Sequence, residues 1–170
     1  MTSKAFIVLG MHRSATSLMG KGLFLSGVDI GEKLIGKKKG NMKGHWEDKE
    51  FVILNDKILK AAGGAWNNPP DEKSILEKGK QFNEEIKNII TKKKIKEIWG
   101  FKDPRTTLTI KLYLPYLKDV DVHFFCCFRK PIKVAESLKV RDGTKIKNSI
   151  NLAKIYNDRL LSFMEWWGEL

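Results

Sequence analysis

A short apolar run near the start of the chain predicts the first element of the fold. Residues 5–9 are all apolar and carry no charge, which is typical of a parallel strand buried on both faces. The run ends at Gly10, and small hydroxylated residues follow at Ser14, Thr16 and Ser17. Each of these three is a candidate N-cap for a helix, because the next apolar residues recur at helical spacing. The pattern therefore predicts a strand, a tight loop and the start of a helix.

Two further apolar runs predict strands, the first of them buried, and each is followed by a proline that starts a helix. Residues 95–101 form the first of these runs, after which Asp103 is a candidate N-cap and Pro104 takes the first helical position. Residues 120–128 form the second, and Pro131 follows it in the same way. Both junctions combine a strand end, charged residues and a helix start.

Three more helices are predicted from helical spacing of apolar residues. Asp48 caps a helix whose apolar face extends to residue 62, and Asp71 opens one that continues to residue 89. The last helix covers residues 146–167, and its spacing directs Met164 and Trp167 inward. The segment 31–44 between these elements is glycine-rich and basic, which indicates a loop.

Strands that alternate with helices indicate an α/β protein with a mainly parallel central sheet flanked by helices. The length of 170 residues suits one sizeable core, so we expect one domain over residues 1–170. In such sheets, ligands bind at the carboxyl ends of the strands. Here those ends are residues 10–17, 102–105 and 129 onward, and all three carry cations.

The charge balance favours an anionic ligand. The net charge is +12, from 32 basic and 20 acidic residues. Its densest runs, Lys37–Lys39 and Lys92–Lys94, indicate solvated loops or helix ends, although polyanion binding stays open. No run approaches the roughly 18 apolar residues that span a bilayer, and the N-terminus lacks a signal-peptide layout. We therefore expect a cytoplasmic protein without a membrane span.

Cysteine and histidine usage gives no sign of a metal site. Cys126 and Cys127 are adjacent within an apolar run, so they are expected in the core, on opposite faces of a strand, and cannot form an ordinary disulfide with each other. The chain has three histidines and no Cys/His cluster at ligand spacing. We therefore expect no metal.

The loop after the first strand resembles the P-loop pattern G-x-x-x-x-G-K-[ST], with one difference. Gly10 and Ala15 take the glycine positions and Ser17 the hydroxyl position, but Thr16 replaces the lysine. Arg13 supplies a cation inside the loop instead. ATP and GTP chemistry needs that lysine together with magnesium, whereas the helix N-terminus keeps its phosphate-binding N–H groups. The pattern predicts a three-layer P-loop-type fold, with an ordinary strand-to-helix turn capped by serines as the alternative.

At this point two stretches resemble motifs of the PAPS-dependent sulfotransferases, in particular the short bacterial branch. Residues 10–18 are similar to that family's 5′-phosphosulfate loop, and residues 128–137 to its 3′-phosphate motif, in which an arginine at a strand end precedes a serine by eight residues. Further stretches resemble motifs of the bacterial branch and occur in the same order along the chain. These are residues 43–47, Trp66 with Pro69, residues 102–105 and residues 137–143.

The resemblance implies a sulfotransferase that moves a sulfuryl group from PAPS (3′-phosphoadenosine 5′-phosphosulfate) to a hydroxyl or amine by in-line transfer. The product would be 3′,5′-ADP, without a metal, and the partner would be a small-molecule or carbohydrate acceptor rather than a nucleic acid. The implied cofactor-binding residues are Gly10, His12, Arg13, Ser14, Ala15, Thr16, Ser17, Arg129 and Ser137. Backbone N–H groups from Ser14 to Ser17 would hold the 5′-phosphate. Arg13 would stabilise charge on the leaving phosphate, and Lys102 would be the second catalytic cation.

The chain also departs from the family pattern. Ala15 replaces the usual loop glycine, so its φ is expected to be negative. Pro104 stands where the cytosolic animal branch has its histidine base. Glu47 and Asp103 are the remaining candidates for the base, provided that burial raises the carboxyl pKa. Their alternatives are a helix-dipole partner for Glu47 and a helix N-cap for Asp103. For His12, the alternative to cofactor binding is a structural role.

Several questions stay open from the residues alone. The runner-up functions are a P-loop kinase for a small molecule and a non-catalytic polyanion-binding protein. The acceptor cannot be identified, although the segment 31–46 and the residues around Trp66 would shape its pocket. The chain is shorter than most of the family, so the resemblance leaves open that a C-terminal portion of the family fold is missing.

Overall fold

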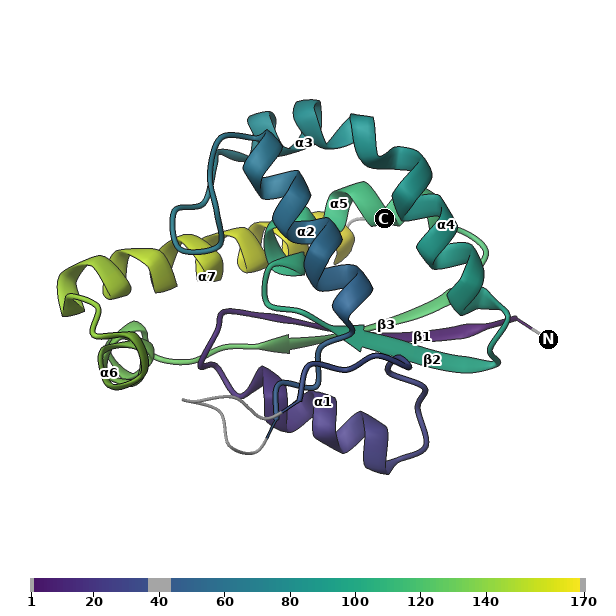
Figure 1. Cartoon of the computed structure of the whole chain (residues 1–170), viewed down its shortest axis with the longest axis horizontal. Coiled ribbons are helices and arrows are strands. Elements are labelled where there is room, and N and C mark those ends of the chain that lie inside the picture. Colours follow the sequence, from purple (N-terminus) through teal and green to yellow (C-terminus); the bar gives the residue numbers. More distant parts are fainter. Residues whose placement is uncertain (1, 37–43, 169–170) are drawn as a thin grey trace.

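The computed structural model describes residues 2–36 and 44–168. Within these residues, three strands and seven α-helices make up the fold (Figure 1). In chain order they are β1 (Lys4–Gly10), α1 (Thr16–Leu25), α2 (Lys49–Ala61), α3 (Glu72–Gly79), α4 (Asn83–Lys94), β2 (Ile98–Lys102), α5 (Thr106–Tyr113), β3 (Asp121–Cys127), α6 (Pro131–Asp142) and α7 (Ile146–Gly168). Two short 3₁₀ helices, η1 (Lys80–Phe82) and η2 (Leu114–Tyr116), follow α3 and α5.

The strands form one sheet in the order β2–β1–β3, and both neighbouring pairs are parallel. Val8 lies opposite Lys102, and Gly10 at the end of β1 lies opposite Cys127 at the end of β3. This confirms the predicted α/β class, and among the described residues the sheet is entirely parallel. Because the strands run in the same direction, their carboxyl ends meet at one edge of the sheet.

Helices cover both faces of the sheet (Figure 1). The helix α1 lies on one face, and α2 to α5 together with α7 lie on the other. Buried side chains form a large cluster on the latter side, around Phe51 and Phe101, and a small cluster around Val8 on the α1 side. Cys126 packs against the large cluster and Cys127 against the small one. The two thiols therefore point to opposite faces as predicted, and both cysteines are free.

Several helix boundaries lie where the sequence predicts them. The Asp48 side chain accepts a hydrogen bond from the Glu50 N–H at 3.0 Å and caps α2. Asp71 caps α3 in the same way, and Pro131 is the first residue of α6. That helix ends at Gly143, whose φ of 70° favours glycine.

The long helix predicted from Asp71 to residue 89 is wrong, because η1 divides it into α3 and α4. A Cβ atom at Gly79 would lie only 2.3 Å from a Leu112 methyl carbon, so the bare glycine backbone packs closely against α5 just before the break. The strand predicted from Ile95 begins only at Ile98. Ile95 instead caps the C-terminus of α4 and is 82% exposed.

Two details of the later helices are also corrected. The helix α5 begins at Thr106 rather than at Pro104, and neither residue 103 nor 104 is its N-cap. The reason is a turn, in which the Thr106 N–H donates to the Asp103 carbonyl at 2.9 Å before the helix starts. In α7, Met164 and Trp167 are 43% and 37% exposed instead of buried. The inward face passes through Leu152, Tyr156, Leu160 and Phe163.

One of the two lysine runs lies in the described part of the chain. Lys92–Lys94 forms the last turn of α4, a helix end as predicted. Lys93 pairs with Asp48 at 2.7 Å, and Lys94 pairs with Asp119. The other run, Lys37–Lys39, lies outside the described residues. Over residues 2–36 and 44–168, no helix has the length and apolar character needed to cross a membrane.

Candidate functional site

A pocket of about 440 Å³ opens at the carboxyl edge of the sheet. Its walls come from the loop between β1 and α1, from the start of α1 and from the residues after β3. They are Arg13, Ser14, Ala15, Thr16, Ser17, Phe128 and Arg129. All except Phe128 belong to the set that the sequence predicts for phosphate binding. The two predicted phosphate motifs therefore share one pocket.

The loop at this pocket has an unusual backbone. Gly10 has a φ of 139°, and a Cβ atom there would lie 2.5 Å from the Cys127 carbonyl oxygen, so only glycine fits. Arg13 and Ala15 have φ values of 70° and 67°, in the left-handed region. The expected negative φ at Ala15 is therefore wrong. Such a conformation costs an alanine about 1–2 kcal/mol, and strain of this kind is found mostly at functional sites.

The start of α1 differs from the sequence prediction. Ala15 is its N-cap residue and no side chain caps the helix, so the candidate caps Ser14, Thr16 and Ser17 do not take that role. The Ser14 N–H donates to the Met11 carbonyl at 3.1 Å, and this removes it from the predicted phosphate-binding donors.

Three polar groups at this helix start have no partner within the described part of the chain. They are the N–H groups of Ala15 and Thr16 and the hydroxyl oxygen of Ser14, which is buried. A helix supplies no acceptor to its first N–H groups. These donors, added to the helix dipole, favour an anion in the pocket.

Two hydrogen bonds join the motifs that lie far apart in the sequence. The Arg13 Nε–H donates to the Ser137 hydroxyl on α6 at 2.8 Å, across a separation of 124 residues. The Arg129 guanidinium donates to the Arg13 carbonyl oxygen at 2.7 Å. Arg13 therefore contacts both Arg129 and Ser137, the two residues that the resemblance assigns to the 3′-phosphate.

The charges around Arg13 are mostly positive. Burial lowers the pKa of Arg13, and the nearby charges of Arg141 and Arg129 lower it further. Asp142 opposes them, but it is already bound to Arg141 through two hydrogen bonds of 2.7 and 2.6 Å. Because like charges repel, this group of guanidinium ions favours a negatively charged ligand.

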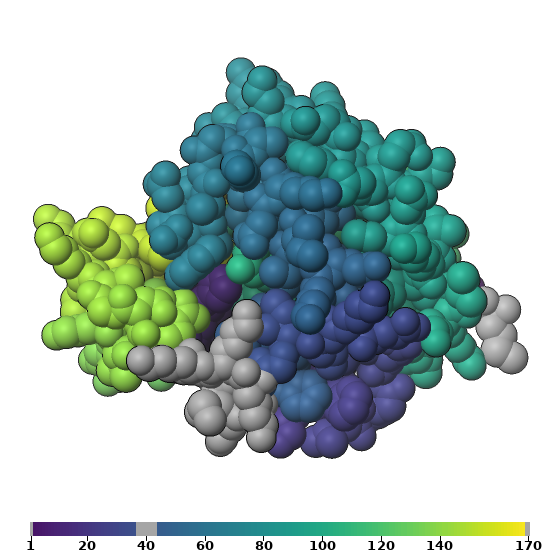
Figure 2. Space-filling model, in the orientation of Figure 1, coloured from purple at the N-terminus to yellow at the C-terminus, as the bar shows by residue number. Residues whose placement is uncertain are grey.

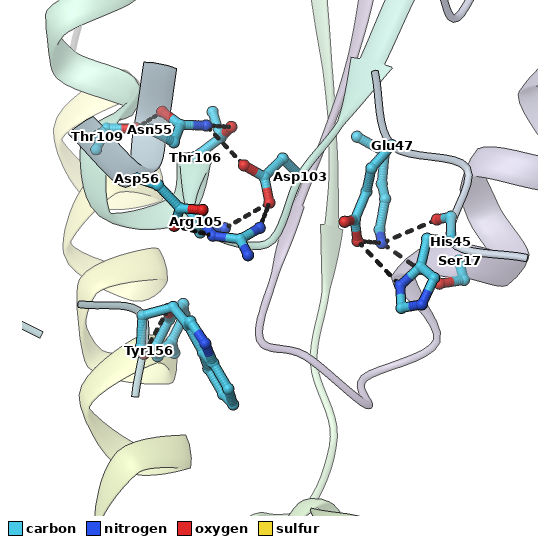
Figure 3. A network of polar contacts seen from close by, with 12 residues as sticks. Ser17, His45, Glu47, Asn55, Asp56, Asp103, Arg105, Thr106, Thr109 and Tyr156 are labelled. Atoms are coloured by element: carbon cyan, nitrogen blue, oxygen red, sulfur yellow. Dashed lines mark hydrogen bonds and ion pairs between the residues drawn. The ribbon is translucent and has the colours of Figure 1, made fainter. Parts of the chain in front are cut away.

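Lys102 brings a further cation to the loop from the end of β2. Its side chain is 2% exposed, and its ammonium donates to Glu47 at 2.5 Å, to the His45 carbonyl at 3.2 Å and to the Ser17 hydroxyl at 3.3 Å. Figure 3 shows Glu47, His45 and Ser17 gathered on one side of the β1–α1 loop. The predicted catalytic cation therefore lies directly beside the loop.

Glu47 does not meet the condition that the sequence sets for a general base. Burial raises the pKa of its carboxyl, but its contacts with His45 and Lys102 outweigh burial and lower the pKa to about 2. A carboxylate with so low a pKa is a weak base. Glu47 also does not act as a simple dipole partner of α2, because its carboxylate is the counter-ion of Lys102.

Asp103 belongs to a second polar network, which is drawn on the other side of the loop in Figure 3. Its carboxylate accepts from the Asn55 amide at 2.9 Å and from the Arg105 guanidinium at 2.8 Å. Burial raises the pKa of Asp103, although the Arg105 charge opposes this shift. The side chain is fully buried and both oxygens are occupied. Asp103 is thus apart from the pocket.

Two more titratable residues, Arg105 and His12, lie in or near the loop. Arg105 also binds Asp56 at 2.6 Å. Burial lowers its pKa, but the carboxylates of Asp103 and Asp56 outweigh burial and raise the pKa above the ordinary value. His12 is buried, does not line the pocket, and lies with its ring centroid 4.5 Å from that of Trp66.

Several residues that shape this region are not predicted from the sequence. Thr107 accepts the Gly10 N–H at 2.8 Å and so fixes the end of β1. Asn55 lies on the buried face of α2 with Leu54 and Ile58. A polar residue at an apolar position was the available signal, because such a group must find partners. No sequence pattern of this kind marks Arg141 as a residue near the pocket.

Comparison with protein-family models, curated proteins and solved structures finds no match for the chain. The family resemblance therefore remains a prediction from the residues.

Proposed function

We propose that the protein is a PAPS-dependent sulfotransferase that transfers a sulfuryl group to a hydroxyl or amine of a small-molecule or carbohydrate acceptor. The supporting observation is the junction of the two phosphate motifs, in which Arg13 binds Ser137 and Arg129 binds the Arg13 carbonyl. PAPS carries a 3′-phosphate that ATP lacks. A nucleotide site with cations for two separate phosphates fits PAPS better than ATP.

The residues around the pocket fit such a donor. The N–H groups of Ala15 and Thr16 and the buried Ser14 hydroxyl would hold the 5′-phosphate. Arg129 and Ser137 would hold the 3′-phosphate. When bound, PAPS supplies the activated sulfuryl group, so the protein mainly orients the reactants and stabilises charge.

Arg13 and Lys102 are the cations that would stabilise the transfer. Charge develops on the oxygen that leaves the sulfuryl group, and a cation fixed beforehand near that oxygen lowers the barrier. Arg13 is fixed through its side chain and its carbonyl, and Lys102 through Glu47. Both are therefore organised before a substrate binds.

The kinase alternative is less well supported. In P-loop NTPases, the hydroxyl at the position of Ser17 binds magnesium. Here the Lys102 ammonium lies 3.3 Å from the Ser17 hydroxyl oxygen, and two cations so close together would repel each other. Lys93 and Lys94 do not support the alternative of a polyanion-binding protein, because both are paired with carboxylates.

The test is transfer of labelled sulfate from PAPS to a panel of sugars, lipids and small alcohols and amines. Adenosine 5′-phosphosulfate, which lacks the 3′-phosphate, serves as a second donor. Wild type should prefer PAPS, and Arg129→Ala should lose that preference. Lys130→Ala removes the same charge from the neighbouring exposed residue, which does not line the pocket, and should behave as wild type. Absence of transfer to every acceptor, with no binding of 3′,5′-ADP, would refute the proposal.

A further inference from the structure

His12 is a buried titratable side chain to which the proposed transfer gives no task. Its residue is 9% exposed, and its Nε2 atom is buried without a hydrogen-bond partner within residues 2–36 and 44–168. Buried polar atoms are nearly always paired, so an unpaired one calls for an explanation. His12 directly precedes Arg13, the cation expected at the leaving phosphate.

The surroundings of His12 keep its imidazole neutral. Burial lowers the pKa of His12 well below its ordinary value of 6.5, and the charge of Arg105 lowers it further. Lys102 and Arg141 act in the same direction, and Glu47 opposes them. A neutral imidazole with its proton on Nδ1 presents Nε2 as a proton acceptor.

The other candidate bases are already committed to other contacts. Glu47 is the counter-ion of the buried Lys102, at 2.5 Å. Both carboxylate oxygens of Asp103 accept hydrogen bonds from Asn55 and Arg105. Protonation of either carboxylate would remove the negative charge from a buried ion pair. The Nε2 atom of His12 has no hydrogen bond to give up within the described residues.

Trp66 covers the imidazole in this structure. The two ring centroids are 4.5 Å apart, and the Arg141 guanidinium lies 5.4 Å from the centroid of the Trp66 ring. The Trp66 backbone is held separately, because its carbonyl accepts from the Tyr156 hydroxyl at 2.9 Å. The indole side chain can therefore rotate without breaking this backbone contact. On this face, Figure 2 shows a recess between α6 and the segment before α3, with purple atoms of the N-terminal region at its floor.

We propose that His12 is the general base of the transfer, and that its Nε2 takes the proton of the acceptor hydroxyl when the acceptor displaces the Trp66 indole. In this step the acceptor oxygen forms a bond to the sulfur of PAPS, and the O–H proton passes to Nε2. The bond from sulfur to the 5′-phosphate oxygen breaks, and 3′,5′-ADP leaves with that electron pair. No other reactant is needed. This inference rests on the proposed sulfotransferase function.

The first test is independent of turnover. The chain has three histidines, His12, His45 and His123, so ¹⁵N NMR of the imidazoles can be assigned with one His→Gln variant each. With 3′,5′-ADP bound, the His12 ring should be neutral at pH 7 with Nε2 unprotonated, and should titrate only below pH 6.5. A proton on Nε2 at pH 7 would overturn the proposal.

The second test separates a base from a structural side chain. His12→Gln places an amide close to the Nε2 position, where it can form hydrogen bonds but cannot take a proton. This variant should keep its affinity for 3′,5′-ADP and lose about 100-fold or more in kcat. In wild type, kcat/KM should fall at low pH because His12 becomes protonated. This fall, the acid limb of the pH profile, should be absent in His12→Gln.

The outcomes distinguish this inference from the function on which it rests. If His12→Gln turns over PAPS as fast as wild type, His12 is not the base, and the sulfotransferase proposal stands. Wild type that neither binds 3′,5′-ADP nor turns over PAPS would overturn the function and this role together. Trp66→Ala uncovers the imidazole, so it should retain the acid limb. Loss of that limb in Trp66→Ala would contradict the role of His12 as the base.

Discussion

Arg13 is held in place by its neighbours at two points. Ser137 accepts from its side chain at 2.8 Å, and Arg129 binds its carbonyl oxygen at 2.7 Å. Its backbone is in the left-handed region, with a φ of 70°. A cation fixed in this way needs little reorganisation when charge develops on a nearby oxygen, and this is the condition for strong transition-state stabilisation.

Arg13→Ala should therefore reduce kcat far more than it weakens PAPS binding. We expect a loss of about 100-fold or more in kcat, the scale for removing one such stabilising group. Arg13→Lys should recover part of the rate, because it keeps the charge and loses the planar fork. Turnover with labelled PAPS is compared with donor affinity for each variant. Equal losses of rate and affinity would make Arg13 only an anchor.

Glu47 should stabilise the fold in a pH-dependent way. Its pKa of about 2 lies below its ordinary value of 4.5, so its stabilisation is complete above about pH 4.5 and is lost as the pH falls toward 2. At pH 7, Glu47→Gln should lower the free energy of unfolding by about 3 kcal/mol, because Lys102 stays buried without its counter-ion. The difference from wild type should shrink as the pH falls below 4.5.

Denaturant unfolding at several pH values between 3 and 7 provides the measurement. Glu50→Gln is the matched control, because Glu50 lies near the same end of α2 but is about half exposed. It should change stability by less than about 0.5 kcal/mol. A Glu47→Gln effect that is constant over this pH range would contradict the ion-pair assignment.

The residues of the loop could be predicted because they are consecutive, whereas the contacts among distant residues could not. The glycine, the serines and Arg13 lie within eight positions, and a strand followed by a helix brings such residues together in any fold of this type. The Lys102–Glu47 ion pair joins residues 55 apart in the sequence. Its existence depends on how the chain before α2 passes the end of β2, which no local pattern contains.

At the scale of elements, the left-handed backbone at the start of α1 lowers the stability of the fold, and one substitution can remove this strain. Ala15 has a φ of 67° and its side chain is exposed. Ala15→Gly should stabilise the protein by about 1 kcal/mol, because glycine adopts this conformation without steric cost. Ala62→Gly, at a φ of −80°, should destabilise it by roughly 0.5–1 kcal/mol. Thermal or denaturant unfolding checks both, and a loss of stability in Ala15→Gly would contradict the left-handed conformation.

The helices α2 and α5 are joined through one buried side chain, Asn55. Its amide donates to Asp103 and Thr106 at 2.9 Å each, and its oxygen accepts from Thr109 and Tyr113 at 2.7 and 2.9 Å. The side chain is fully buried. Its removal would leave several buried polar groups without partners.

Asn55→Ala should therefore lower the free energy of unfolding by at least about 3 kcal/mol. Ile53→Ala, on the same helix at 57% exposure, should cost less than about 0.5 kcal/mol. Both can be measured by chemical denaturation. A loss below about 1 kcal/mol for Asn55→Ala would show that the network does not join the two helices as described.

Helix boundaries were predicted well where a side chain caps the helix and poorly where tertiary contacts decide. Asp48 and Asp71 cap α2 and α3 as their sequence patterns indicate. Asp103 has the same pattern before Pro104, but its carboxylate is taken up by Asn55 and Arg105, and α5 begins later. The N-cap position is thus Arg105, while the Asp103 carboxylate binds Asn55 on α2 and the adjacent Arg105.

At the scale of the whole molecule, the parallel sheet determines where the site lies. The ends of β1, β2 and β3 meet at one edge, so the loop after Gly10, Lys102 and Arg129 come together although they are far apart in the chain. The alternation of strands and helices predicted this arrangement. The order β2–β1–β3 could not be predicted, because it depends on how the strands pair across the whole chain.

On the proposed function, this edge of the sheet binds a nucleotide that carries a 3′-phosphate, and binds it without a metal. Calorimetry with 3′,5′-ADP in the presence of a chelator, compared with ATP plus magnesium, tests it most directly. We expect 3′,5′-ADP to bind more tightly than ATP. Arg129→Ala should weaken the binding of 3′,5′-ADP by roughly 2 kcal/mol, about 30-fold in Kd, and leave the binding of 5′-AMP nearly unchanged. The proposal would be contradicted if binding strictly required magnesium or if ATP bound more tightly. It would also be contradicted if Arg129→Ala weakened 3′,5′-ADP and 5′-AMP equally.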